Sequence, residues 1–95
     1  MLSIEELNAA AAALYNPVEN FEPASNIDHA ELLVTWCESL GNTVTKEFVR
    51  GRGKNPSFYR VTVTTPNEAT WVRASSFIPV AITSAILFYE GVDNV

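Results

Sequence analysis

Hydrophobic residues recur at helical spacing near the start of the chain. Ser3 and Glu6 stand three residues apart, the spacing of a capping box, in which each side chain binds a free backbone N–H at a helix start. The apolar positions that follow lie three or four residues apart and are Leu7, Ala10, Ala11 and Leu14. Because proline disfavours the α conformation of the residue before it, the helix should end before Pro17. The pattern therefore predicts a helix over residues 3–15.

The second helical pattern is bounded by residues typical of helix ends. Asn26 is a preferred N-cap, Asp28 places negative charge in the first turn, and Gly41 can adopt the left-handed conformation that ends a helix. The apolar stripe between them comprises Ala30, Leu33, Cys37 and Leu40, widened by Val34 and Trp36. These features predict a helix over residues 27–40 with one buried face.

From Thr43 onward, apolar residues alternate with polar ones, a pattern typical of β-strands. Residues 43–50 and 57–64 are rich in β-branched and aromatic side chains, and the glycines between them allow a turn. In the second of these strands, alternation directs three side chains towards the core: Tyr59, Val61 and Val63.

A third strand is expected over residues 69–73, after a turn at residues 65–67 that contains a proline and an asparagine. Neither set of alternate residues in this strand is wholly apolar. The pattern therefore leaves open whether Trp71 or Val72 faces inward.

The last apolar segment is hydrophobic on more than one helical face. Ser75 or Ser76 should cap a helix over residues 77–90, in whose first turn Pro79 is tolerated because no N–H is needed there. One face comprises Ile78, Ile82, Ala85 and Tyr89, and other faces carry Val80, Leu87 and Phe88. A helix of this kind is largely buried or meets a partner, so we expect a homodimer or a partner-bound form.

The order of the expected elements, α-α-β-β-β-α, predicts an α+β fold. Ninety-five residues are enough for one domain with its own core. A three-stranded antiparallel β-meander with short turns needs one covered face, and the second and last helices carry apolar stripes that can cover it. We therefore expect a single domain, residues 1–95, in which the meander packs against helices.

Charge is distributed unevenly along the chain. Residues 1–45 contain seven acids and no Lys or Arg (−7), residues 46–73 contain all six basic residues and two acids (+4), and two further acids follow (−2), for a net charge of −5. The acidic excess argues against general binding to nucleic acid or to an anionic membrane.

No apolar run is long enough to span a membrane, the start lacks the basic flank of a signal peptide, and the single cysteine suits a reducing compartment. We expect a cytoplasmic protein.

One histidine and one cysteine limit the chemistry that the chain can perform. His29 has no second metal ligand at a suitable spacing, and it is expected to be a solvated residue near a helix start. Cys37 is expected in the core, late in a helix where the dipole disfavours a thiolate. Because no nucleophile and base can be paired, we expect no catalytic residues, no metal site and no cofactor, and hence no enzyme.

The densest group of basic residues lies in the segment "EFVRGRGKNPSFYRV", residues 47–61. Its candidate partner-binding residues are Arg50, Arg52, Lys54, Phe58 and Arg60. It lacks the Walker pattern and does not open a helix, so a phosphate-binding loop is not expected. Three alternatives stay open: a solvated turn, a contact with a protein, or a nucleic-acid contact that is weak and salt-sensitive because few phosphates could be neutralised.

Two segments resemble the phage ABA-sandwich domain, a family of small phage and prophage proteins. "PASNIDHAELLVTWCESLG" resembles the family's polar cap and Ala-rich amphipathic helix, and "ASSFIPVAITSAILFYEG" resembles its Ser/Ala-rich turn and closing apolar helix. The chain differs in having no clear strand between its first two helices and in its basic hairpin tip. The resemblance implies the fold and a viral origin, and it implies no catalytic residues.

The small size, the lack of catalytic residues and the resemblance together predict a phage-encoded, non-enzymatic binding protein. Its expected partner is a host or defence protein, and an inhibitor such as an anti-CRISPR is one case. The alternative function is that of a nucleic-acid accessory protein that uses the basic hairpin, residues 50–60.

Overall fold

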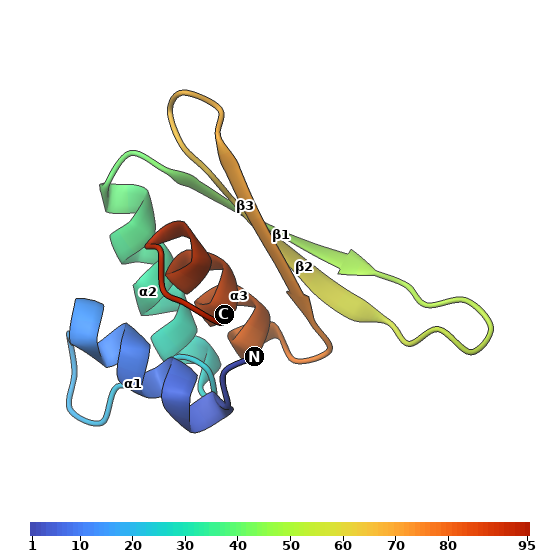
Figure 1. The fold of residues 1–95 in the computed structure, drawn as a ribbon, viewed down its shortest axis with the longest axis horizontal. Helices are drawn as coiled ribbons and strands as arrows, with labels where there is room; N and C mark the ends of the chain where they lie inside the picture. The colour runs from blue at the N-terminus through green and yellow to red at the C-terminus, as the bar shows by residue number, and fades with distance from the viewer.

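A computed structural model describes residues 1–95 and contains three helices and a three-stranded antiparallel sheet (Figure 1). The elements follow one another as α1 (Ile4–Leu14), α2 (Ile27–Ser39), β1 (Thr43–Val49), β2 (Phe58–Thr64), β3 (Thr70–Ser75) and α3 (Ile78–Tyr89). The predicted α+β class and the order α-α-β-β-β-α are therefore confirmed. Each element begins and ends within two residues of its predicted bounds.

The first two helices begin at the side chains that the sequence indicates. Ser3 Oγ accepts a hydrogen bond from the N–H of Glu6, and the Glu6 carboxylate accepts one from the N–H of Ser3, which completes the capping box. Asn26 accepts hydrogen bonds from the N–H groups of Asp28 and His29. Gly41 follows α2 with a φ of 94°, a left-handed conformation that favours glycine.

The start of α3 differs from the prediction. Its N-cap residue is Phe77, which makes no side-chain capping hydrogen bond. Neither Ser75 nor Ser76 caps the helix, because β3 runs two residues further than predicted and Ser75 is still paired with Tyr59 of β2. The Ser75 hydroxyl instead accepts a hydrogen bond from the N–H of Phe77.

The strand register places the apolar residues of the sheet on one face. The strands are ordered β1-β2-β3, and Val44, Val63 and Trp71 lie opposite one another across them. Val44 and Val63 are buried and Trp71 packs against the core, whereas Val72 is exposed. Trp71 is thus the inward-facing residue of the third strand, and its ring meets Tyr89 of α3 edge to face at 5.3 Å.

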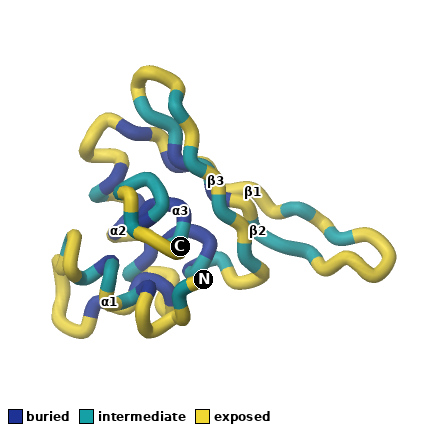
Figure 2. The backbone as a smooth tube through the Cα atoms, in the orientation of Figure 1, coloured by how far each residue is buried: buried dark blue, intermediate teal, exposed yellow.

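All three helices lie on one side of the sheet, with α3 at the centre (Figure 1). This helix packs against β2 and β3 on one side and against α1 and α2 on the other, and α2 also contacts β1. The surfaces of α3 that are apolar in sequence are therefore covered within one chain, as its buried residues in Figure 2 show. We predicted a homodimer because α3 is apolar on more than one face. Since these faces are covered within one chain, they no longer support that prediction.

The predicted apolar stripes of α1 and α2 are buried along most of their length but not at the C-terminal ends of the helices. Leu7 and Ala11 are buried on α1, and Leu33 and Cys37 on α2. Leu14 and Leu40, which we expected to complete the stripes, are 40% and 51% exposed.

The β1–β2 hairpin extends beyond the rest of the molecule (Figure 1). Only Tyr59 to Thr64 of β2 pair with β3, so the remaining end of the hairpin and its connecting loop have no third strand beside them. The molecule measures 40 × 32 × 24 Å, and Figure 2 shows that the loop is almost entirely exposed.

None of the three helices combines the length and the apolar character that a membrane crossing requires.

Candidate functional site

The loop at the hairpin tip, residues 50–57, is held together by its own hydrogen bonds. The N–H of Gly51 donates to Ser57 Oγ at 2.9 Å, and the N–H of Asn55 donates to the Arg52 carbonyl oxygen at 3.0 Å. A Cβ atom at position 51 would overlap the backbone of residues 55–57, so only glycine fits there. The sequence thus builds a defined tip in which the two sides of the loop lie close together.

Three of the predicted binding residues come together on this tip as unpaired cations. Arg50, Arg52 and Lys54 are exposed, and none forms an ion pair or a side-chain hydrogen bond within the chain. Arg50 and Arg52 also line a shallow open hollow with Val49, Pro56 and Phe58. The tip therefore combines free positive charge with a small apolar surface.

The fourth predicted cation, Arg60, does not belong to this group. It lies directly opposite Glu47 across the hairpin and donates to the Glu47 carboxylate from Nε at 2.9 Å and from Nη2 at 2.6 Å. Facing residues of opposite charge on antiparallel strands stabilise the pairing of those strands. Arg60 is thus engaged within the hairpin rather than free for a partner.

The aromatic residues of the hairpin lie on two different faces of it. Phe58 is half-buried on the face that carries Arg60, while Phe48 and Tyr59 lie opposite each other on the face that carries the core. The Phe48 and Tyr59 rings are 5.1 Å apart, and Phe48 is 57% exposed. We did not single out Phe48 from the sequence, although alternation along β1 with Val44 would have placed it on this face.

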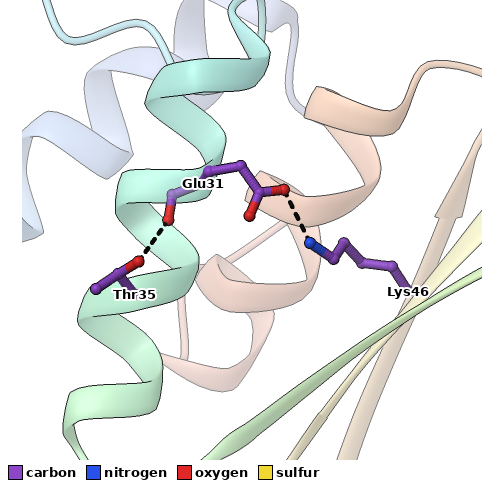
Figure 3. Close-up of polar contacts among 3 residues, drawn as sticks. All are labelled: Glu31, Thr35 and Lys46. Atoms are coloured by element: carbon purple, nitrogen blue, oxygen red, sulfur yellow. Dashed lines mark hydrogen bonds and ion pairs between the residues drawn. The ribbon is translucent and has the colours of Figure 1, made fainter.

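The two remaining basic side chains of the chain are also engaged. Lys46 Nζ lies 2.8 Å from Glu31 Oε1 of α2, so this ion pair ties β1 to the helix (Figure 3). The guanidinium of Arg73 lies 3.6 Å from the centre of the Phe88 ring and donates hydrogen bonds to the carbonyl oxygens of Val72 and Val95. Of six cations, the three on the tip are the ones left free.

The charges are separated along the molecule. The acidic first part of the chain forms α1, the following loop and α2, whereas the hairpin tip extends away from these helices (Figure 1). Positive and negative charge therefore face different directions, and the tip presents the positive end.

His29 and Cys37 are both structural residues. His29 Nδ1 accepts a hydrogen bond from the N–H of Glu22 at 3.0 Å, and its ring stacks on Phe21 with the centroids 5.6 Å apart. It is half-buried and holds the loop before α2, so our description of it as a solvated residue was wrong. Cys37 is fully buried, and burial raises the pKa of its thiol.

The most enclosed pocket of the molecule has a volume of about 280 Å³ and lies between α1, β3 and α3. Its walls are mainly apolar and include Leu7 and Val80, and its polar side chains are Arg73, Ser75 and Ser84. No general base lies beside either serine, and nowhere in the chain do three His, Cys, Asp or Glu side chains converge. This arrangement offers no activated nucleophile.

No family model matches the chain, and comparisons with curated proteins and with solved structures found no match either. The resemblance to the phage ABA-sandwich domain therefore stays a prediction from the sequence.

Proposed function

We propose that this protein is a non-enzymatic binding protein that docks onto an acidic surface of a partner protein through the tip of its β1–β2 hairpin. The family resemblance makes a host or defence protein in the cytoplasm the first partner to test. The absence of a paired nucleophile and base in the pocket and around His29 and Cys37 supports binding rather than catalysis.

The observation that carries this proposal is the separation of paired from unpaired cations. Lys46, Arg60 and Arg73 are each engaged within the chain, whereas the three cations of the tip are exposed and free. Like charges held close together on an exposed loop repel one another and contribute nothing to folding. An acidic partner would relieve this repulsion and be attracted from a distance.

The geometry favours a protein over nucleic acid as the partner. Three free cations could neutralise about three phosphates, which gives weak and strongly salt-dependent binding. Of the aromatic residues that could stack on bases, Phe58 is half-buried, and the exposed Phe48 lies on the other face of the hairpin, so the two rings cannot form one stacking surface. The acidic helices would in addition repel a phosphate chain that extended beyond the tip.

The test compares two triple variants that carry the same net charge. Arg50→Ser, Arg52→Ser and Lys54→Ser together remove three positive charges, and the control replaces three exposed asparagines far from the tip, Asn20→Asp, Asn67→Asp and Asn94→Asp. Each set changes the net charge from −5 to −8, since −5 − 3 = −8. Both variants and the parent protein are used as bait in a lysate of host cells, with and without nuclease and at two salt concentrations.

The parent and the asparagine variant should retain the same nuclease-resistant partner, and the serine variant should lose it. Binding by the parent should weaken as salt rises, because the attraction acts between exposed charges. Retention of the partner by the serine variant would contradict the proposal. Loss of all binding after nuclease treatment would instead favour the nucleic-acid accessory function.

A further inference from the structure

One edge of the sheet is an unpaired strand. Strand β1 pairs with β2 on one side only, and the register runs without interruption from Thr43 to Val49. The strand contains no proline and no bulge, the features that most often prevent an edge from pairing with another chain. The N–H and C=O groups of every second residue of β1 point away from β2 and are therefore available to a further strand.

Charged side chains on an edge strand usually protect it from such pairing. The two charged residues of β1, Lys46 and Glu47, already form ion pairs within the chain. Lys46 is drawn towards α2 by its ion pair with Glu31 (Figure 3), and Glu47 is paired with Arg60 on the opposite face. An incoming strand would therefore meet no free charge on β1 itself before it reached the tip. There it would meet Arg50, the first of the three unpaired cations.

The other edge of the sheet is already partly occupied. On β3, the carbonyl oxygen of Val72 accepts a hydrogen bond from Arg73 Nη1 at 2.9 Å. The same guanidinium donates from Nε to the Val95 carbonyl oxygen at 3.2 Å, which holds the C-terminal segment beside this strand. The two edges thus differ, and β1 is the open one.

Side chains along β1 indicate what kind of segment fits this edge. Phe48 is 57% exposed and offers an apolar surface beside the edge. Thr45 is exposed and uncharged, and the free cations follow the end of the strand. A complementary segment would be extended, with an apolar side chain over Phe48 and carboxylates beside the tip.

We propose that β1 binds an extended acidic segment of the partner protein as a fourth strand of the sheet. This inference rests on the proposed function, and it adds to the contact at the tip a second contact made by backbone hydrogen bonds. The backbone contact supplies affinity, and the tip charges select an acidic sequence.

The probe is obtained by selecting twelve-residue random peptides on the parent protein, and each enriched peptide is then measured against the parent and against the serine variant of the tip. Enriched peptides should alternate apolar and other residues and carry acids at one end. Amide hydrogen exchange is then measured with the best peptide. The exchange rates of the outward N–H groups of β1 should fall at least about tenfold when the peptide is bound. The exchange rates of the N–H groups of β3 should not change.

A proline variant separates backbone pairing from attraction by charge. Neighbouring residues of a strand direct their N–H groups to opposite sides, so either Thr45 or Lys46 has an outward, fast-exchanging N–H. Proline at that position, Thr45→Pro or Lys46→Pro, should leave the protein folded and raise the Kd of the peptide about tenfold or more above that of alanine at the same position, which removes the same side chain but keeps the N–H. The matched control places proline at an outward N–H of β3, where peptide binding should be retained.

Equal peptide binding by the β1 proline variant would overturn strand addition and leave docking at the tip intact. Enriched peptides that bind the serine variant as tightly as the parent would overturn both proposals. If the β1 amides became more protected from exchange as protein concentration rose in the absence of peptide, the fourth strand would come from a second copy of the chain. That result would overturn pairing with an acidic segment of a partner. Displacement of every enriched peptide by oligothymidine, or the failure of any peptide to enrich, would also overturn the inference.

Discussion

Thr83 lies in the middle of α3 with its side chain fully buried, and its hydroxyl oxygen has no hydrogen-bond partner. Burying a hydroxyl group without a partner costs free energy because its hydrogen bonds to water are lost. Thr83→Val keeps the branched shape and removes this cost. The free energy of unfolding, measured by chemical denaturation, should therefore rise by about 1 kcal/mol.

Thr35→Val is the matched control for this prediction. Thr35 is exposed on α2 and donates a hydrogen bond to the Glu31 carbonyl oxygen (Figure 3), so its replacement should change the stability by less than about 0.5 kcal/mol. A lower stability of Thr83→Val would show that the buried hydroxyl does form a hydrogen bond in solution.

Cys37 should make the stability of the protein depend on pH in the alkaline range. Burial raises the pKa of its thiol in the folded protein, an effect that outweighs the opposing hydrogen bond from Asn42. Unfolding restores an ordinary thiol pKa of about 8.5. Above that pH the unfolded chain loses a proton that the folded protein keeps, so the free energy of unfolding falls as pH rises.

The measurement compares the parent with Cys37→Ala between about pH 7.5 and pH 9.5. Other titrating groups are common to both proteins, so the parent should show the steeper fall. The native thiol should also react with a thiol reagent much more slowly than the unfolded one. Equal slopes and rapid native labelling would show that Cys37 is accessible.

At the scale of the element, α2 contributes to the core through a narrow face. Leu33 is fully buried, whereas its neighbour Leu32 is 36% exposed. Leu33→Ala should lower the free energy of unfolding by about 2–5 kcal/mol, because it leaves a cavity against α3. Leu32→Ala removes the same atoms from a partly exposed position and should cost clearly less. Similar losses in the two variants, measured by denaturant titration, would contradict the packing of α2.

The elements also show which local signals were sufficient to predict the fold. The capping box at Ser3 and the N-cap at Asn26 act within one helical turn, and the structure confirms both. The failure at α3 has a cause that is not local, because β3 continues through Ser75, which pairs with Tyr59, and the helix begins after Phe77. A strand end depends on pairing with β2, which is distant in sequence.

At the scale of the whole molecule, the hairpin tip is separate from the core. Replacing residues 50–57 by Asn-Gly would join the strands by a two-residue turn. Because a shorter loop loses less entropy on folding, thermal and chemical denaturation should show stability that is unchanged or higher by about 1 kcal/mol. Binding of the partner should be lost. A loss of more than about 2 kcal/mol would show that the tip contributes to the fold.

Much of the candidate site could be predicted from the sequence alone. The glycines, the proline and the group of basic residues indicated an exposed hairpin tip, and Arg50, Arg52 and Lys54 do lie there. Pairing of charges could not be predicted in the same way. Arg60 and Glu47 face each other only because of the strand register, and Lys46 meets Glu31 only because α2 packs beside β1.

The sequence by itself determined the class of each element, because helix and strand periods and most caps depend on residues within a few positions of one another. The tertiary structure alone decided that Trp71 faces inward, that α3 is covered within one chain, and that His29 holds the loop before α2. Each of these outcomes depends on contacts between residues far apart in sequence. Local pattern carries no information about which distant surface will cover an apolar face or engage a charge.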